Sequence, residues 1–345
     1  MDQFSLLFQR PYHVKIEKRT LAAPLETQVL VKTVYSSISA GTEMLLYHDL
    51  LKQGTVLDTT IPSLSRRFTY PCAYGYSCVG TVTRLGKKIP SRWLGRRVFA
   101  FHPHESHFNA TPEELIPLPS GMSWKNALFL PSMETAVNLL MDGAPRPREK
   151  IVVFGQGVIG LLLTGLIARK KGVTLVTVDR YPLRRNMSLL LGASESLERY
   201  THGQSFFTQQ TVGDDGRPTL CFEVSGNPNA LNDAIQTTGF GGRIIVGSWY
   251  GTKRISLDLG THFHRNRLHL QSSQVSTIDP HLSAQWTKER RLAVALKMIQ
   301  ELRPSRLITH TYPFRRAADA YTLLDAHPEN VIQVILDYQG EHGKV

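Results

Sequence analysis

Residues 150–179 read KIVVFGQGVIGLLLTGLIARKKGVTLVTVD, and this stretch decides the fold. Residues 151–154 form a short apolar run that predicts a buried strand. Glycines follow at positions 155, 157 and 160, and an apolar segment compatible with a helix continues from them. A second apolar run ends at Asp179. The stretch therefore predicts a strand, a tight turn, a helix and a second strand.

The glycine spacing and the terminal acid together indicate a dinucleotide site. In such a turn one glycine allows the bend, one lets backbone amides approach a pyrophosphate, and one lets the helix pack closely on the sheet. The start of the helix offers its N–H groups and its positive dipole end to the phosphates. A tight turn without a ligand would explain the glycines but not the acid that follows the second strand. The predicted cofactor-binding residues here are Gly155, Gly157, Val158, Ile159, Gly160, Asp179 and Arg180.

The alternation of strands and helices continues beyond this stretch. Residues 219–224 and 243–246 read as further strands, and each ends in small residues. Small residues at the ends of neighbouring parallel strands leave room for a ligand across the sheet. The sequence therefore predicts a Rossmann domain, a doubly wound parallel sheet of the α/β class. Its further predicted cofactor contacts are Ser225, Gly226, Gly247, Ser248 and Ser273.

Composition and charge limit the class of protein. The chain has 345 residues, of which 41% are hydrophobic and 20% charged, as expected for a soluble two-domain enzyme. The net charge is +12, but the basic residues are spread over several short groups, which favours a solvated surface over a nucleic-acid partner. Three scattered cysteines suit a reducing compartment, and the first residues contain no basic leader. We therefore expect a cytoplasmic location.

Residues 151–168 carry no charge and are long enough for a minimal membrane span. The glycine turn inside the segment and its charged flanks favour a buried α/β core instead, so no membrane association is expected. The domains are predicted as a mainly β region over residues 1–120, the Rossmann domain over 121–272, and a carboxyl-terminal segment over 273–345. A helix is predicted over residues 124–141.

This order of regions resembles the medium-chain dehydrogenase/reductase superfamily over essentially the whole chain. The local matches are GYSCVG at 75–80, GRRVFAF at 95–101, FEVSG at 222–226 and GGRIIVG at 241–247. Within the superfamily, ISAGTE, METAVN, GQGVIG and SSQV resemble the zinc-lacking branch related to the bacteriochlorophyllide hydroxyethyl dehydrogenases. The resemblance implies a GroES-like catalytic domain that includes the final segment, a small-molecule substrate and a homodimer.

The positions that carry zinc ligands in the superfamily hold other residues here. By resemblance, a cysteine is replaced near Ser39 or Ala40, and a histidine and a glutamate are replaced by Tyr76 and Ser77. A fourth ligand is missing near Pro131, and the lobe with four close cysteines is absent from the sequence. These side chains offer neither the thiolate nor the imidazole that a catalytic zinc requires. We predict an enzyme without catalytic zinc.

One other segment, HPHESH at 102–107, was considered as a metal site. Its histidines alternate, and alternate residues of a strand share a face, so His102, His104 and His107 could meet at one ion. A polar loop explains the same residues without a metal. We therefore predict no metal ligand in the chain.

Without a metal, a side chain must manage the charge that develops on the substrate oxygen. By resemblance, the segments that line the cleft supply the candidates Glu43, Thr42, Tyr76, His48 and Glu134. Glu43 and Thr42 could relay a proton, or Glu43 could be a helix-start carboxylate. Tyr76 could bond the substrate oxygen or only pack, and His48 could be a relay or structural. Glu134 could act beside the nicotinamide or be a charge near a helix start.

The leading prediction is an NAD(P)-dependent oxidoreductase, without catalytic zinc, that interconverts a secondary alcohol and a ketone. The first alternative is a quinone or enoyl reductase of the same fold, and the second is a non-catalytic nucleotide-binding protein. Asp179 would repel a 2′-phosphate, which favours NAD. NADP stays open as the alternative cofactor because Arg180, Arg184 and Arg185 could neutralise that phosphate.

Overall fold

The computed structural model describes residues 1–199 and 216–342. The chain forms two compact units, one of Met1–Pro131 with Ile299–Val345 and one of Ser132–Met298. These limits differ from the domain boundaries predicted at 120/121 and 272/273. The helices α3 (Leu130–Gly143) and α7 (Lys288–Leu302) each run across a limit between units. The boundaries of independently folding domains remain a prediction.

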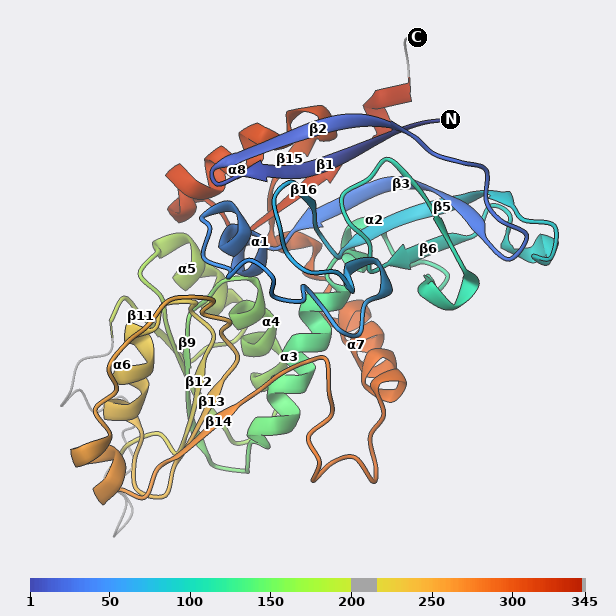
Figure 1. Cartoon of the computed structure of the whole chain (residues 1–345). Helices are drawn as coiled ribbons and strands as arrows, with labels where there is room; N and C mark the ends of the chain where they lie inside the picture. Colours follow the sequence, from blue (N-terminus) through green and yellow to red (C-terminus); the bar gives the residue numbers. More distant parts are fainter. Residues whose placement is uncertain (200–215, 343–345) are drawn as a thin grey trace. The chain divides into compact units, whose positions relative to one another are not determined.

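The first unit is mainly β (Figure 1). Its larger sheet has the strand order β15-β16-β3-β5-β6-β8, with β7 also paired to β3. The strands are β3 (Val29–Ile38), β5 (Cys78–Leu85), β6 (Arg97–Ala100), β7 (His107–Ala110), β8 (Leu115–Pro117), β15 (Ile308–Pro313) and β16 (Gln333–Asp337). Because β16 pairs antiparallel with β3, the last part of the chain lies in the same sheet as the amino-terminal part.

A smaller sheet of the order β2-β1-β4 contributes apolar residues to a hydrophobic cluster of the first unit. It consists of β1 (Asp2–Arg10), β2 (His13–Thr20) and β4 (Cys72–Ala73), and the helices of the unit are α1 (Ala40–Tyr47), α2 (Trp124–Ala127) and α8 (Ala317–Ala326). Apolar residues from β1, α1 and α8, such as Phe8, Leu46 and Tyr321, pack into one cluster. This cluster fixes α1, which carries the candidate catalytic residues Thr42 and Glu43.

The second unit is a parallel sheet of the order β11-β10-β9-β12-β13-β14. Its strands are β9 (Lys150–Phe154), β10 (Thr174–Val178), β11 (Glu195–Leu197), β12 (Leu220–Glu223), β13 (Arg243–Val246) and β14 (His269–Ser272). Numbered within the unit this is 3-2-1-4-5-6, the doubly wound order in which the order of the strands reverses between β9 and β12. The predicted Rossmann sheet is confirmed.

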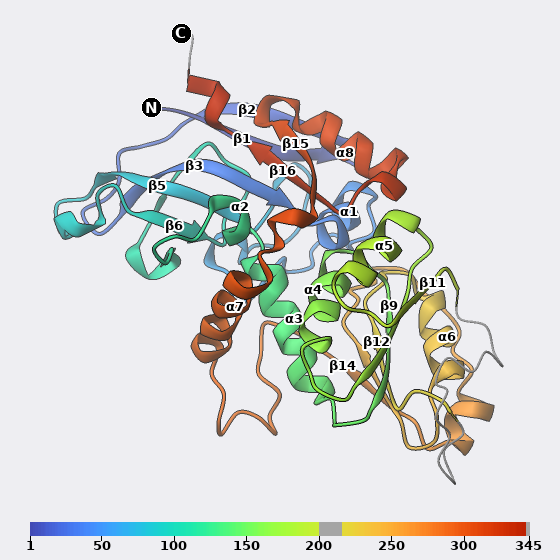
Figure 2. The same cartoon turned by 180° about the vertical axis from the view of Figure 1, so that it is seen from behind.

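Helices cover both faces of this parallel sheet. They are α4 (Val158–Ile167), α5 (Pro182–Leu190) and α6 (Asn229–Thr237), together with the part of α3 in this unit. Figures 1 and 2 show α6 on one face and α3 and α4 on the other. The strand cores are almost wholly apolar because both faces are buried, as in residues 151–154. None of the helices in the described residues is both long and apolar enough to cross a membrane.

The helix predicted over residues 124–141 is wrong in one respect, since the structure has two helices there. A short helix, α2, ends at Ala127, and α3 begins at Leu130. The apolar periodicity continues across the break because both segments bury residues such as Ala127, Leu128 and Leu130. The periodicity of burial therefore did not reveal the change in backbone path.

Candidate functional site

The glycine turn lies between β9 and α4, and two of its glycines are required by the protein itself. Gly155 has φ +93°, and a Cβ there would overlap the backbone of Ser225 at the end of β12. A Cβ at Gly160 would overlap the carbonyl oxygen of Gly155, so the first turn of α4 packs directly on the strand end. Neither position can hold a side chain.

Gly157 is different, because a Cβ at this position would meet nothing within 4 Å. Its φ is −68°, which any residue can adopt, so neither the backbone nor the packing demands a glycine. Gly157 is also the N-cap of α4 and provides no side chain to the N–H groups of Val158 and Ile159. The turn therefore leaves an open space at a helix N-terminus, where an anionic group of a ligand fits.

Asp179 lies at the end of β10, beside this turn. Its carboxylate accepts hydrogen bonds from the backbone N–H of Gln156, at 2.7 Å, and of Tyr181, at 2.9 Å. The acid is thereby fixed to the glycine turn, and each oxygen keeps a further lone pair for a ligand hydroxyl. Arg180 and Arg184 both lie over the ring of Tyr181, at 4.5 and 4.8 Å from its centroid. Two cations therefore lie next to the acid.

The other predicted cofactor contacts occupy the carboxyl ends of the next strands. Ser225 and Gly226 follow β12, Gly247 and Ser248 follow β13, and Ser273 follows β14. The hydroxyl of Ser248 accepts a hydrogen bond from the N–H of Gly226 at 2.9 Å, which joins the first two strand ends. A ligand of an open α/β sheet binds outside this edge at the point where the strand order reverses. The predicted contacts therefore all lie at the carboxyl edge of the parallel sheet.

Glu134 belongs to a polar row on α3, and Ser273 contacts this row from the end of β14. The side chain of Asn138 donates to the hydroxyl of Ser273, which in turn donates to Asp142 one helical turn further along. One turn earlier on α3, the carboxylate of Glu134 pairs with the fully buried guanidinium of Arg291 at 2.9 Å. The same guanidinium donates to Asn138 and to the backbone carbonyls of residues 275 and 277.

Arg291 was not identified from the sequence, because its partner Glu134 is 157 residues away and arginines of the surface have the same local pattern. Burial raises the pKa of Glu134, and the charge of Arg291 opposes the rise. These contacts give Glu134 a partner that fixes the segment after β14. A catalytic role of Glu134 remains a prediction.

In the first unit, Glu43 is fully buried at the start of α1. Its carboxylate accepts hydrogen bonds from the N–H of Ser39, at 2.8 Å, and from the phenol of Tyr321, and it lies 3.1 Å from His104 Nε2. The other ring nitrogen of His104 meets the hydroxyl of Ser36 at 2.7 Å. Glu43 is thus held by three separate segments, and its predicted role as a relay remains a prediction.

Tyr76 and Thr42, the next two candidates, lie together beside Ser39. The phenol of Tyr76 donates a hydrogen bond to the hydroxyl of Ser39 and lies 3.3 Å from the hydroxyl of Thr42. Burial raises the pKa of Tyr76, and the two hydroxyl contacts oppose the rise. At neutral pH this is a set of three neutral hydroxyls.

The fifth candidate, His48, stands apart from these hydroxyls. Its Nε2 lies 2.8 Å from a carboxylate oxygen of Asp325, and its ring contacts Tyr12 and Tyr47. The imidazole therefore links the end of α1 to α8. These contacts agree with the structural alternative for His48. A role of His48 as a proton relay remains a prediction.

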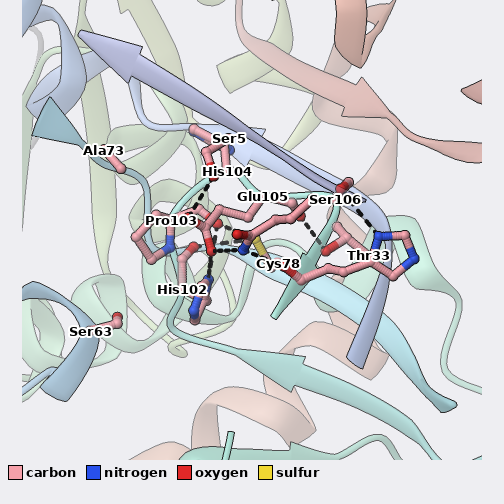
Figure 3. A network of polar contacts seen from close by, with 12 residues as sticks. Ser5, Thr33, Ser63, Ala73, Cys78, His102, Pro103, His104, Glu105 and Ser106 are labelled. Atoms are coloured by element: carbon pink, nitrogen blue, oxygen red, sulfur yellow. Dashed lines mark hydrogen bonds and ion pairs between the residues drawn. The ribbon is translucent and has the colours of Figure 1, made fainter. Parts of the chain in front are cut away.

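The histidines of residues 102–107 do not converge. The shared strand face that a metal site would need is not present, since β6 ends at Ala100 and β7 begins at His107, and the polar loop given as the alternative is what the structure has. His102, labelled beside Glu105 in Figure 3, has its Nδ1 3.7 Å from a Glu105 oxygen. Its ring stacks on Phe108, while His104 turns to Glu43. His107 lies beside Ser106. Three rings that face different partners cannot share one ion.

The bend that separates these rings is held by the polar network drawn in Figure 3. The carboxylate of Glu105 accepts hydrogen bonds from Gln3, at 2.8 Å, and from Ser5, at 2.9 Å. The backbone carbonyl of Glu105 accepts from Thr33, and the thiol of Cys78 donates to the carbonyl of His102 at 3.2 Å. The network fixes residues 102–106 to β1, β3 and β5 and thereby aims His104 at Glu43.

The donor set of the first unit was also tested for a metal. In residues 1–199 and 216–342 there is no group of three or more His, Cys, Asp or Glu side chains arranged to hold one. The hydroxyl of Ser39 accepts a hydrogen bond from the phenol of Tyr76, and the hydroxyl of Ser77 donates to the carbonyl of Leu128 at 2.7 Å. Hydroxyls are poor ligands for zinc, which prefers thiolate and imidazole. The residues present do not fit a catalytic zinc.

The chain is similar to several known proteins along most of its length. No protein-family model matches the chain. The chain is 21% identical to the starvation-sensing protein RspB of Escherichia coli (strain K12), over 97% of this chain and 99% of that protein. It is 23% identical to D-guloside 3-dehydrogenase of the same organism, over 75% of this chain and 76% of that protein.

Among solved structures, the rspB protein of Escherichia coli CFT073, complexed with NADH, aligns with a TM-score of 0.74 and 18% identity. The alignment covers 98% of this chain and 99% of that one. These likenesses confirm the predicted fold and support the resemblance to the medium-chain dehydrogenases and reductases. They leave the zinc-lacking branch as a prediction.

Proposed function

We propose that the protein is an NAD(P)-dependent oxidoreductase that interconverts a secondary alcohol and a ketone on a small molecule, with NAD as the preferred cofactor. The observation that carries the proposal is the open space at Gly157, between the start of α4 and the fixed carboxylate of Asp179. A diphosphate matches the first feature and a ribose diol the second. One similar solved structure is complexed with NADH, and one relative is D-guloside 3-dehydrogenase. Both likenesses support the proposed oxidoreductase function.

We further propose that the reaction proceeds without catalytic zinc and that Tyr76 takes over the task of polarising the substrate oxygen. The cofactor, when bound, supplies the hydride chemistry. The raised pKa of Tyr76 keeps its phenol protonated at neutral pH, so it can donate to an oxygen on which negative charge develops. Ser39 and Thr42 are each both donor and acceptor, so either can turn to donate to the phenol oxygen when its proton faces the substrate.

The donor chemistry supports the absence of zinc, and the fixed position of Ser39 supports the role of Tyr76. The N–H of Ser39 is bonded to buried Glu43, which is itself bonded to Tyr321 and close to His104. Glu43 therefore acts on Tyr76 through the backbone of Ser39. This makes Glu43 a positioning residue in the proposed reaction rather than the proton donor.

The proposal is tested with the purified protein after dialysis against a chelator. A panel of polyols, glycosides and simple secondary alcohols is offered with NAD⁺ and with NADP⁺, and the reduced cofactor is followed by absorbance while metal content is measured in parallel. We expect turnover of at least one alcohol with NAD⁺ at an unchanged rate after chelation. A requirement for stoichiometric zinc would contradict the zinc-independent reaction. Turnover only of quinones or enones would favour the reductase alternative, and failure to bind either cofactor would remove the proposal.

A further inference from the structure

Glu223 is a carboxylate buried at the ligand edge of the parallel sheet. It is the last residue of β12, beside the reversal point between β9 and β12, and its side chain is fully buried. One oxygen accepts hydrogen bonds from the N–H and the hydroxyl of Ser225. The other accepts from the phenol of Tyr250, on the loop after β13. The carboxylate thus joins the two loops that follow neighbouring strands.

Lys253, an exposed residue of the loop after β13, contacts the turn after β12. Its ammonium donates to the carbonyl of Gly226 at 2.9 Å, while the N–H of Gly226 is held by Ser248. A Cβ at Gly226 would meet nothing within 4 Å, as at Gly157. The turn after β12 is therefore held through both the N–H and the carbonyl of Gly226. No atom of the described residues occupies the space next to the Cα of Gly226.

A positive group at this edge of the sheet would offset the repulsion between the cofactor diphosphate and the carboxylate of Glu223. A dinucleotide diphosphate carries negative charge, and the carboxylate of Glu223 lies at the same edge of the sheet. Two negative groups in a poorly hydrated site repel each other unless a positive group lies nearby. The three bonds to Glu223 come from neutral donors, which leave its charge in place. Lys253 and Glu223 interact electrostatically, since the carboxylate works against the lowering of the lysine pKa by burial.

We propose that Lys253 is a cofactor-binding residue whose ammonium offsets the charge of Glu223 at the edge where the diphosphate binds, while Tyr250 and Ser225 hold the carboxylate in place. This inference rests on the proposed function, because the anion is the diphosphate of the nicotinamide cofactor. Of the residues in this inference, Lys253, Glu223 and Tyr250 were not indicated as cofactor contacts by the sequence. The loop after β13 then contributes to cofactor affinity through charge as well as through its backbone.

The test is calorimetric titration of the full-length protein with NADH at low and high salt. Lys253→Gln is compared with Arg254→Gln, which removes the same charge from the neighbouring exposed residue. We expect Lys253→Gln to raise the Kd about fivefold at low salt and less at high salt, because exposed charges are screened. Arg254→Gln should leave the Kd within about twofold of the wild-type value.

A double variant separates charge compensation from simple attraction. If Lys253 offsets Glu223, then Glu223→Gln combined with Lys253→Gln should bind NADH more tightly than Lys253→Gln alone. Tyr250→Phe, which keeps both charges, shows the effect of loosening the loop. Equal Kd values for the Lys253 and Arg254 variants, or a double variant no better than Lys253→Gln, would overturn the inference while wild-type binding upholds the proposed function. Absence of binding by the wild-type protein would overturn both.

Discussion

The phenol of Tyr76 donates a hydrogen bond to the hydroxyl of Ser39, although these residues are 37 positions apart and stand where relatives by resemblance carry metal ligands. Ser39 is fixed in turn through its N–H to buried Glu43. A pair of hydroxyls on a rigid support can orient a proton toward a substrate oxygen, whereas it cannot supply the charge of a metal ion. The proposed chemistry therefore depends on the phenol.

We expect Tyr76→Phe to lower kcat by about 100-fold, because it removes the hydrogen-bond donor from the transition state. The Kd for NADH and the melting temperature should change little, since the ring is kept. Because burial raises the pKa of this phenol, the alkaline decline of kcat in the wild-type protein should lie above the ordinary tyrosine value of about 10. Tyr12→Phe, at an exposed position of the same unit, is the control. Wild-type turnover by Tyr76→Phe would exclude the proposed role.

The two glycines Gly157 and Gly160 should respond to alanine in opposite ways. Gly160→Ala forces a Cβ into the carbonyl of Gly155 and should reduce the free energy of unfolding by about 1–3 kcal/mol. Gly157→Ala meets no protein atom within 4 Å and should leave the free energy of unfolding within about 0.5 kcal/mol of wild type. Its added methyl should nevertheless weaken NADH binding. Urea unfolding and calorimetric titration measure the two effects. Unchanged NADH affinity in Gly157→Ala would contradict a diphosphate at this turn.

Asp179→Ser should change the choice of cofactor. The substitution removes the carboxylate that would bind the ribose diol, so the Kd for NADH should rise about tenfold. It also removes the negative charge next to Arg180 and Arg184, so the affinity for NADPH should rise relative to that for NADH. The ratio of the two Kd values is read from fluorescence titrations. Glu198→Gln, an exposed acid of the same unit, should leave the ratio unchanged.

The partly buried ring of His102 predicts a loss of stability in mild acid. Burial lowers its pKa to about 4 in the folded protein, while the unfolded value is about 6.5. Between these values the unfolded chain binds the proton more strongly, so stability present above pH 6.5 is lost as the pH falls toward 4. The loss attributable to this group is on the order of 3 kcal/mol.

Urea unfolding between pH 7 and pH 4 checks this expectation. His102→Gln cannot take up the proton, so its free energy of unfolding should fall less steeply with acid than that of the wild-type protein. His13→Gln, at an exposed histidine, should follow the wild-type curve. Identical slopes for the two variants would mean that His102 is not the group responsible.

Much of the second unit could be read from residues 150–179 alone. The glycines, the apolar strands and Asp179 are neighbours in sequence, and each acts through local geometry: a turn with positive φ at Gly155, a helix start at Gly157, and an acid at a strand end. Strands buried on both faces have a continuous apolar pattern that survives in any parallel sheet. These features indicated the fold class and the edge at which a cofactor would bind.

The partners of the charged and polar residues were decided only by the tertiary structure. The sequence marked Glu43 and Glu134 as candidates, but it did not reveal that His104 and Tyr321 meet the first or that Arg291 meets the second. It also left both a strand and a polar loop open for the histidines of 102–107, where contacts with Gln3, Ser5 and Thr33 hold a bend. A backbone turn is encoded by the few residues that form it, whereas the environment of a buried charge depends on segments that only folding brings together.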